Sequence, residues 1–243
     1  MAIKDYLMIG KCLYLTKLKI LAIGDLHLGY EPMLRNEGIS FPFNQLKQSE
    51  QDIEKIINQI KIQKNKVSKI IILGDLKHHF NFNPGEKEEI RNFLEFLEKF
   101  AKKENIILLK GNHEKFELDD RKHHNFYIQE ELAFLHGDKE FPEIWNKKIK
   151  IIIMGHLHPS VILQDKPSIK KEKYKCFLIG KYKRKNIIIV PSFFPLVKGA
   201  GLNEGFQNKK DFSIIPTSKL RKFNVHVLGK DKIYGFGKLK NLD

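Results

Sequence analysis

The feature that most limits how this chain can fold is a series of short apolar runs, most of which end in a glycine followed by Asp, Asn or His. In the first half these runs cover residues 18–24, 70–73 and 106–109. Short runs rich in branched apolar residues and bounded by turn residues are typical of strands buried on both faces. The intervening segments have the length of crossover helices, which predicts a largely parallel sheet with right-handed connections.

Two of these intervening segments carry helical patterns. Residues 44–64 place apolar side chains on one stripe, including Leu46, Ile53 and Ile60. In the next segment Asn83 is suited to cap a helix that has Pro84 at its first position. The segment between residues 24 and 44 contains several Gly and Pro residues and is predicted to be a loop.

The second half of the chain has a different texture. After residue 126 it contains short β-rich segments separated by Gly, Pro or polar turns. These segments predict a second sheet, mixed or antiparallel, packed on the first. The expected fold class is α/β, with residues 1–243 forming a single domain: a layered α/β/β/α sandwich of two mixed sheets flanked by helices. The segments lie near residues 132–135, 149–154, 160–163, 174–179, 186–190, 212–215, 223–228 and 232–236.

Five polar motifs stand at or near the ends of the predicted strands. Because ligands in open α/β sheets gather at the carboxyl ends of strands, these motifs should meet on one rim of the molecule. In chain order they are Gly24-Asp25-Leu26-His27, Gly74-Asp75, Gly111-Asn112-His113-Glu114, His136-Gly137-Asp138 and Gly155-His156-Leu157-His158.

The side chains of these motifs are metal-ligand types. Two Asp, one Asn and four His combine oxygen with imidazole donors and include no thiolate, which suits Mn²⁺, Fe or Zn²⁺ better than Ca²⁺. A pair of divalent ions needs a carboxylate that bridges them. If Asp25 and Asp75 are the only anionic ligands, two such ions keep a charge of +2, which favours a phosphate anion as substrate.

The motif set resembles that of the calcineurin-like metallophosphoesterase superfamily. Within it, the chain is most similar to small archaeal phosphoesterases related to the nuclease subunit of the double-strand-break repair complex. The tract Pro191-Ser192-Phe193-Phe194-Pro195-Leu196 adds to that resemblance. The resemblance implies two divalent ions, with Mn²⁺ as the first expectation and Fe, Zn²⁺ or Ni²⁺ as alternatives. It also implies a DNA-repair setting with a DNA helicase, ATPase or ligase as partner.

The resemblance also implies a role for each motif residue. One metal would be bound by Asp25, His27 and His158, and the other by Asn112, His136 and His156. Asp75 would bridge them, and a metal-held hydroxide would attack the phosphorus. His113 would be the catalytic residue that is not a ligand, stabilising charge on the phosphorus or protonating the leaving oxygen.

Two motifs depart from the superfamily's pattern. Many members have Asp-Arg three and four residues after the second-motif Asp, whereas here Asp75 is followed by Leu76-Lys77-His78-His79. The arginine that helps hold phosphate is therefore absent, and the candidate substitutes are Lys77, His78, His79 and Arg35. The alternative for His78 and His79 is a solvated loop. Asp138 stands where many relatives have a second histidine, and it is placed to orient a ligand.

Charge and composition narrow the partners. The chain holds 44 Lys+Arg against 29 Asp+Glu, a formal net charge of +15, which suits an anionic partner such as single- or double-stranded nucleic acid. Residues 166–185 are strongly basic and interleaved with aromatics, a pattern that fits nucleic-acid contact but is better explained by a β-hairpin with its apolar side chains in the core.

Cys12 and Cys176 have no metal or disulfide spacing, which fits a cytoplasmic protein. No apolar run reaches the length of a membrane span, so no membrane partner is expected.

Together these observations predict a metal-dependent phosphoesterase that cleaves phosphodiester bonds of nucleic acid or nucleotides. Two alternatives stay open. One is a phosphodiesterase restricted to small cyclic or linear nucleotides, since substrate range depends on the loops around a site rather than on the fold. The other is a non-catalytic nucleic-acid-binding or scaffold protein.

Overall fold

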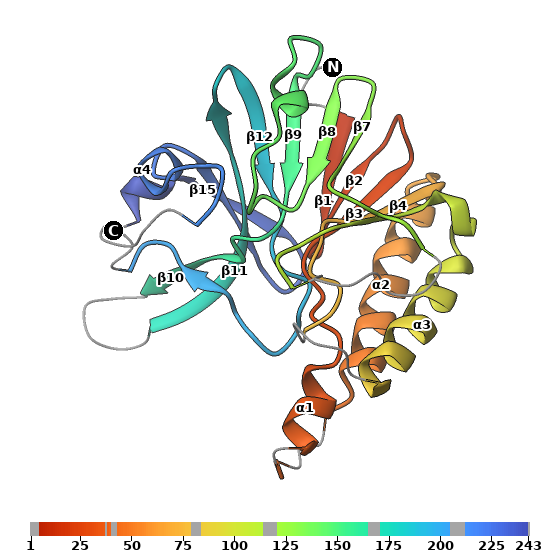
Figure 1. The fold of residues 1–243 in the computed structure, drawn as a ribbon. Helices are drawn as coiled ribbons and strands as arrows, with labels where there is room; N and C mark the ends of the chain where they lie inside the picture. The colour runs from red at the N-terminus through yellow and green to blue at the C-terminus, as the bar shows by residue number, and fades with distance from the viewer. Residues whose placement is uncertain are drawn as a thin grey trace.

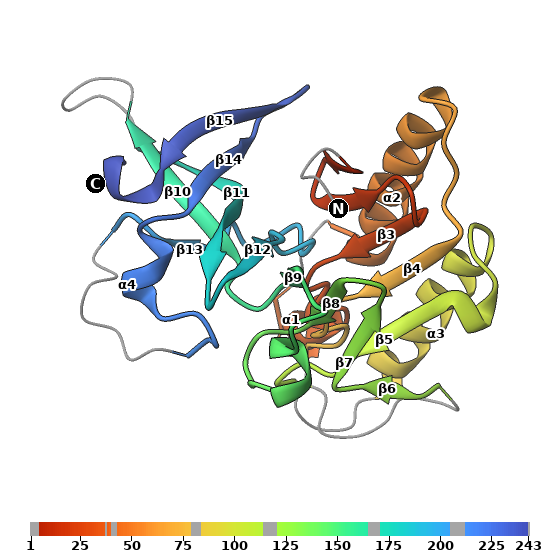
Figure 2. The ribbon, with the colours of Figure 1, turned by 90° about the horizontal axis from the view of Figure 1, so that it is seen from above.

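The structure is a computed structural model that describes residues 5–36, 38–39, 43–78, 84–113, 121–164, 171–204 and 212–242, without the side chains of residues 32, 35, 36, 84 and 85. Two β-sheets pack face to face, and the long helices cover one of them (Figure 1). In both views α2 and α3 lie on one side of the molecule, and β10, β11 and α4 lie on the other (Figures 1 and 2).

The first sheet has the order β1-β2-β3-β4-β5-β6. Its strands β3, β4, β5 and β6 run parallel, whereas the hairpin β1–β2 pairs antiparallel with β3. The strand bounds are β1 Tyr6–Ile9, β2 Cys12–Leu15, β3 Ile20–Ile23, β4 Lys69–Ile72, β5 Ile106–Leu109 and β6 His123–His124.

Two long helices cover the outer face of this sheet. They are α2 (Gln45–Ile62) and α3 (Pro84–Glu98). The Asn44 side chain caps α2 by accepting a hydrogen bond from the Lys47 amide at 2.7 Å, which satisfies a free N–H of the first turn. The apolar stripe predicted from the sequence is buried against the sheet, as Ile53, Ile57 and Ile60 show.

The second sheet has the order β13-β10-β11-β12-β9-β8-β7, and β14 joins β11 and β15 beside it. The neighbours β8, β9 and β12 are parallel, so their carboxyl ends lie on the same edge. The bounds are β7 Phe126–Gln129, β8 Leu132–Leu135, β9 Ile151–Met154, β10 Pro159–Gln164, β11 Lys171–Tyr182, β12 Lys185–Ile189, β13 Ala200–Gly201, β14 Asn224–Leu228 and β15 Ile233–Lys238.

Buried apolar side chains form three layers that follow this architecture. One layer lies between the first sheet and its helices, a second lies between the two sheets, and a third covers the outer face of the second sheet. On that outer face the helices are short: α4 (Thr217–Leu220) and the 3₁₀ turns Pro142–Trp145 and Leu239–Asn241. The predicted sandwich of two mixed sheets is confirmed.

Several local predictions need correction. Residues 212–215 are not a strand; they are bends that lead into α4. The predicted loop between residues 24 and 44 contains the helix α1 (Tyr30–Asn36). The hairpin β1–β2 was not predicted. By contrast, residues 171–182 form one long strand, paired with β12 as a hairpin, and Cys176 and Phe177 are buried as the hairpin interpretation of the basic segment expected. That interpretation also placed the lysines in water, which is wrong for Lys185, because its side chain is buried. Asn83 lies outside the described residues.

No helix in the described parts of the chain is long and apolar enough to cross a membrane.

Candidate metal centre

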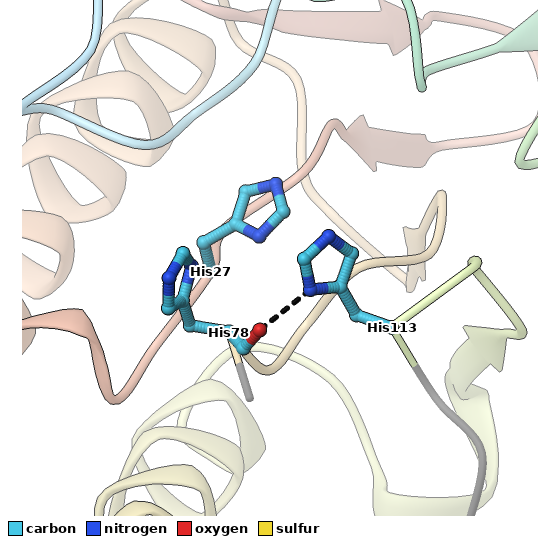
Figure 3. Close-up of side chains that lie close together, drawn as sticks. All are labelled: His27, His78 and His113. Carbon is cyan, nitrogen blue, oxygen red and sulfur yellow. Dashed lines mark hydrogen bonds between the residues drawn. The ribbon is translucent and has the colours of Figure 1, made fainter. Parts of the chain in front are cut away.

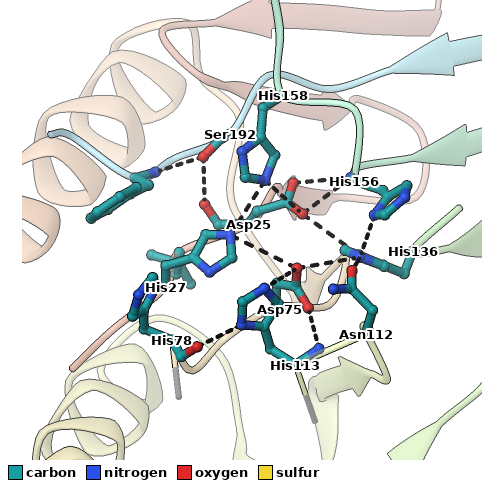
Figure 4. Close-up of polar contacts among 12 residues, drawn as sticks. Asp25, His27, Asp75, His78, Asn112, His113, His136, His156, His158 and Ser192 are labelled. Atoms are coloured by element: carbon teal, nitrogen blue, oxygen red, sulfur yellow. Dashed lines mark hydrogen bonds and ion pairs between the residues drawn. The ribbon is translucent and has the colours of Figure 1, made fainter. Parts of the chain in front are cut away.

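Side chains from all five predicted motifs converge on one site (Figure 4). The first sheet contributes residues that follow β3, β4 and β5, and the second sheet contributes residues that follow β8 and β9. Parallel strands deliver their carboxyl ends to a common edge, and this explains why motifs more than a hundred residues apart meet there. The convergent side chains are Asp25, His27, Asp75, Asn112, His113, His136, His156 and His158.

Three of the predicted ligands form one cluster. The Nε2 atoms of His27 and His158 are 3.3 Å apart, and His158 Nε2 lies 3.3 Å from Asp25 Oδ1. Asp25 has no exposed surface and His27 is buried, while the His158 side chain is partly exposed. The cluster therefore opens towards solvent on the His158 side.

Three others form a second cluster around His136. Its Nε2 atom lies 3.1 Å from Asn112 Oδ1 and 3.0 Å from His156 Nδ1. Asp75 stands between the two clusters. Its Oδ2 atom is 3.4 Å from His136 Nε2 and 3.8 Å from His27 Nε2. The carboxylate of Asp75 thus faces the Nε2 atom of one histidine in each cluster.

Backbone carbonyls select which imidazole nitrogen faces the clusters. A carbonyl only accepts, so the ring nitrogen beside it must carry the proton and donate. His136 Nδ1 donates to Leu73 O at 2.9 Å, and His156 Nε2 donates to Phe212 O at 2.8 Å. The opposite nitrogens, His136 Nε2 and His156 Nδ1, face each other in the second cluster. This is the orientation that a metal-binding histidine usually obtains from its outer partner.

The pKa values of the buried groups reflect mutual charge compensation. Burial disfavours a charged His136, but the neighbouring carboxylates of Asp75 and Asp25 outweigh burial and raise its pKa to about 10. Burial also opposes the ionised form of Asp25 and Asp75, yet the surrounding histidines lower both pKa values. Burial dominates at His27, whose pKa falls to about 3. A positive charge is therefore favoured among these carboxylates.

Backbone conformation marks the same residues. Four of the seven predicted ligands have φ in the left-handed region: His27 at 49°, Asp75 at 46°, His156 at 67° and His158 at 43°. Non-glycine residues adopt this region at a cost of order 1–3 kcal/mol, and such strain is concentrated at functional sites. The strained backbone at this edge lowers the stability of the fold, and it directs these side chains into the site.

The donor set and its spacing fit divalent metal ions. Two nitrogens bound tetrahedrally at 2.0–2.1 Å from one ion would lie about 3.3 Å apart. The separations of 3.3 Å between His27 and His158, and of 3.0 Å between His136 and His156, are close to this value. The proton that the carboxylates favour on His136 occupies the place of a cation, and metal binding releases such protons.

His113 lies beside the clusters in a different environment. Its amide donates to Asp75 Oδ1 at 3.0 Å, and its Nδ1 donates to the backbone carbonyl of His78 at 2.5 Å (Figures 3 and 4). The remaining nitrogen, Nε2, lies 3.9 Å from Asp75 Oδ2, and the side chain is 16% exposed. His113 therefore presents Nε2 at the rim of the centre.

The four residues predicted to contact the substrate differ in where they lie relative to the candidate metal centre. His78 is half-buried, with its ring centroid 5.5 Å from that of His27 and 5.8 Å from that of His113. Lys77 is only 2% exposed. His79 and the side chain of Arg35 lie outside the described residues. The structure thus brings His78 to the centre, and the roles of all four residues stay predictions.

Sequence reasoning did not single out several neighbours of the centre. Tyr30 and Phe194 pack their rings against His78, with centroids 4.8 and 6.4 Å away. Ser192 and Phe212 supply hydrogen-bond partners. The Pro-Ser-Phe-Phe-Pro tract adds to the family resemblance, but nothing in the sequence indicates that Ser192 contacts Asp25. Phe212 carried no signal.

Comparison with known proteins gives a consistent result. The model of the calcineurin-like phosphoesterase family matches residues 18–215, which is most of the chain. Among solved structures, the crystal structure of the Pseudomonas putida nuclease MPE is similar with a TM-score of 0.59 and 15% identity, covering 93% of this chain and 92% of that one, a likeness that shows the fold. No curated protein sequence matches significantly. The chain therefore belongs to the calcineurin-like phosphoesterase family and is a hydrolase.

Proposed function

We propose that this protein hydrolyses phosphodiester bonds of nucleic acid or nucleotides at a centre of two divalent ions. The observation that carries the proposal is the position of Asp75 between two clusters of three donors each. Two ions that share one carboxylate are the usual arrangement for in-line displacement at phosphorus. The alternative of a non-catalytic scaffold gains no support from this geometry, since all seven donors are present.

Seven side chains would hold the ions. Asp25, His27 and His158 would bind one, Asn112, His136 and His156 the other, and Asp75 both. The bound ions would lower the pKa of a coordinated water to about 7 and neutralise charge on the phosphate. Mn²⁺ is the first candidate because the donors mix hard oxygen with imidazole nitrogen, and Fe, Zn²⁺ and Ni²⁺ are the alternatives.

His113 would act on the substrate rather than on the ions. The His78 carbonyl holds the Nδ1 proton, so a proton passed to the leaving oxygen would come from Nε2 of a His113 ring protonated on both nitrogens. His78 is the candidate that we retain for contact with the phosphate, because its half-buried ring borders both His27 and His113. The Asp75 carboxylate accepts a hydrogen bond from the His113 amide, and this bond fixes Asp75 and His113 relative to each other.

Charge supports a polymeric substrate over a small nucleotide. The net charge of +15 would attract a polyanion at long range, and binding through many phosphates releases many counterions. The fold is shared with a protein described as a nuclease. We therefore place nucleic acid first and small nucleotides second.

A substrate panel tests the proposal. Purified protein, stripped of metal and supplied with Mn²⁺, is assayed on single- and double-stranded DNA, RNA, cyclic nucleotides and a chromogenic phosphodiester, each at several salt concentrations. We expect Mn²⁺-dependent cleavage of the chromogenic diester and of at least one polynucleotide, the latter weakening steeply with salt. Turnover of cyclic nucleotides alone, with little salt dependence, would favour the small-nucleotide alternative. If the purified protein binds none of these metals and hydrolyses no diester, the proposed enzymatic function is wrong.

A further inference from the structure

A short segment after β12 connects the second sheet to the metal ligands of the first. The segment Pro191–Phe194 follows Val190, whose amide still pairs with Met154 O at 2.8 Å in the second sheet. Three residues after Val190, Phe193 is fully buried in the layer between the first sheet and its helices. The segment passes so close to β3 that a Cβ on Gly24 would lie 2.5 Å from the Pro191 carbonyl.

This segment holds the backbone of Asp25. The Ser192 hydroxyl donates to Asp25 O at 3.0 Å (Figure 4). The Phe194 amide donates to the same oxygen at 3.0 Å. The Phe194 ring also lies 5.6 Å from the His27 ring. A shift of the segment would therefore move Asp25, whose carboxylate contacts His158 and accepts from the His156 amide at 3.1 Å.

Two lysines in turn hold the segment. Lys175, on β11, donates through Nζ to Ser192 O at 2.8 Å and also to Phe194 O. Lys11, in the turn between β1 and β2, donates to the intervening carbonyl of Phe193 at 3.1 Å and pairs with Asp52 at 2.8 Å. Three consecutive carbonyls thus bind amino groups, one from each sheet.

Lys175 occupies a place that costs stability. Burial lowers the pKa of its amino group to about 7, and the nearby ammonium of Lys11 adds to the lowering. An apolar side chain at this position would avoid that cost. The amino group has at least two N–H bonds in either protonation state, so both carbonyl contacts persist across the change. Its hydrogen bonds go to the segment whose Ser192 and Phe194 bind the Asp25 carbonyl, which points to a role at the metal centre.

We infer that Lys175 is a positioning residue of the metal centre, acting through Ser192–Phe194 on Asp25, with Lys11 as the second anchor. The inference rests on the proposed function. Mutation of a partner that orients a ligand without touching the metal typically costs about 10–100-fold in metal affinity or activity. Loss of Lys175 should therefore weaken metal binding at the cluster of Asp25, His27 and His158.

The chain supplies a matched control in Lys185. This lysine is buried, at 8% exposure, whereas Lys175 is half-buried. The Nζ of Lys185 likewise donates to two backbone carbonyls, Asn146 O at 2.7 Å and Ile149 O at 2.6 Å. It stands at the amino end of β12, whereas the segment 191–194 follows the carboxyl end. Removing Lys185 breaks the same kind of contact away from the metal centre.

The test compares Lys175→Met, Lys175→Arg and Lys185→Met. For each we measure the thermal unfolding midpoint, the affinity for Mn²⁺ by calorimetry, and the Mn²⁺ dependence of chromogenic diester hydrolysis. Lys175→Met should raise the Mn²⁺ concentration for half-maximal rate by about tenfold, with kcat at saturating Mn²⁺ and the KM for the diester within about threefold of wild type. Lys175→Arg, which keeps two donors, should restore most of the affinity. Lys185→Met should lower the thermal unfolding midpoint and leave both the Mn²⁺ affinity and the Mn²⁺ dependence of hydrolysis unchanged.

Wild-type Mn²⁺ affinity in a folded Lys175→Met protein would overturn the inference, as would an equal loss of affinity in Lys185→Met. If Lys175→Met does not fold, Lys11→Met carries the test, because that side chain is 17% exposed and holds the same segment from the other sheet. Unchanged Mn²⁺ affinity there would likewise overturn it. A wild-type protein that binds no Mn²⁺ would instead refute the proposed function.

Discussion

At the candidate metal centre, backbone carbonyls decide which nitrogen of a histidine ring faces the site. The carbonyl of His78 commits Nδ1 of His113 and leaves Nε2 at the rim, 3.9 Å from the Asp75 carboxylate. The carbonyl of Leu73 does the same for His136 but aims its Nε2 between Asn112 and His156. Two histidines with the same kind of outer partner thus point their Nε2 atoms in different directions, which fits the proposed roles of His113 towards the substrate and of His136 towards a metal ion.

Replacing His113 by Ala should separate catalysis from metal binding. We expect near-normal metal content, because the seven predicted ligands remain, and a fall in kcat of about 10²–10⁴-fold, the usual contribution of a general acid. Metal analysis and steady-state kinetics on the chromogenic diester measure the two effects. Loss of both ions in His113→Ala would show that this residue is a ligand and that its assigned role is wrong.

Lys175 predicts a pH dependence of stability whose sign follows from its lowered pKa. The folded value is about 7, whereas an unfolded lysine titrates near 10.4. Between these values the unfolded chain holds a proton that the folded chain has released, so the free energy of unfolding rises with pH in this window. Below pH 7 the folded protein bears the full cost of the buried charge.

The expected gain from this one group between pH 7 and 9 is about 2 kcal/mol as an upper limit. The free energy of unfolding of wild type and of Lys175→Met is measured by urea unfolding at both pH values, with EDTA present so that metals do not contribute. Because the variant lacks the amino group, the difference between the two proteins reports the contribution of that group alone. A difference that is the same at both pH values would contradict the prediction.

At the scale of elements, the strand ends bring the ligands together only because glycines allow close approach. Gly111 follows β5 by two residues, and a Cβ there would lie 2.1 Å from Asp75 Oδ1 and 2.5 Å from the Asp75 amide. The parallel neighbours β4 and β5 could not deliver Asp75 and Asn112 side by side with any larger residue at this point.

Gly111→Ala should therefore displace Asp75 and weaken binding of both ions. We expect metal content at stoichiometric Mn²⁺ to fall and activity with it, while the fold is retained because the clash is local. Gly235→Ala is the matched control, since that glycine lies in β15 and a Cβ added there would have no heavy atom within 4 Å. Equal metal content in the two variants would argue against a bridging role for Asp75.

At the scale of the whole molecule, the candidate metal centre draws its residues from both sheets, which also pack on each other through an apolar layer. Four of the seven predicted ligands follow strands of the first sheet, and three follow strands of the second. Any separation of the sheets would break both clusters, so ions that bind only the assembled centre must stabilise the folded state.

Metal removal should therefore lower the stability of the entire domain rather than of a loop. For one site, Mn²⁺ at a hundred times its Kd should add about 2.7 kcal/mol to the free energy of unfolding, by mass action. Urea unfolding in EDTA and in Mn²⁺ measures this. Asp75→Asn should lose most of the increment. An unfolding midpoint that Mn²⁺ leaves unchanged in the wild type would mean that the centre binds no ion tightly.

Much of the fold was predictable because its signals are local. The runs that became β3, β4 and β5 are short and apolar, and the stripe of α2 has helical spacing, so the two-sheet sandwich followed from the sequence. The errors have physical causes as well. Residues 212–215 are apolar enough to suggest a strand but form bends before α4. Tyr30–Asn36 can form a helix because its proline lies in the first turn, where a missing N–H costs no helical hydrogen bond.

Local chemistry determined the predicted donors: residue type, the strand before each motif and their order along the chain depend only on neighbours in sequence. The family resemblance implied which donors would share a metal ion and that Asp75 would lie between the two groups. Only the tertiary structure sets the distances between these donors and decides which ring nitrogen faces each cluster. The same holds for Lys175, which bonds to residues 17 and 19 positions further along the chain. These properties depend on distances of a few ångströms between segments far apart in the sequence, and only the packing of the two sheets sets those distances.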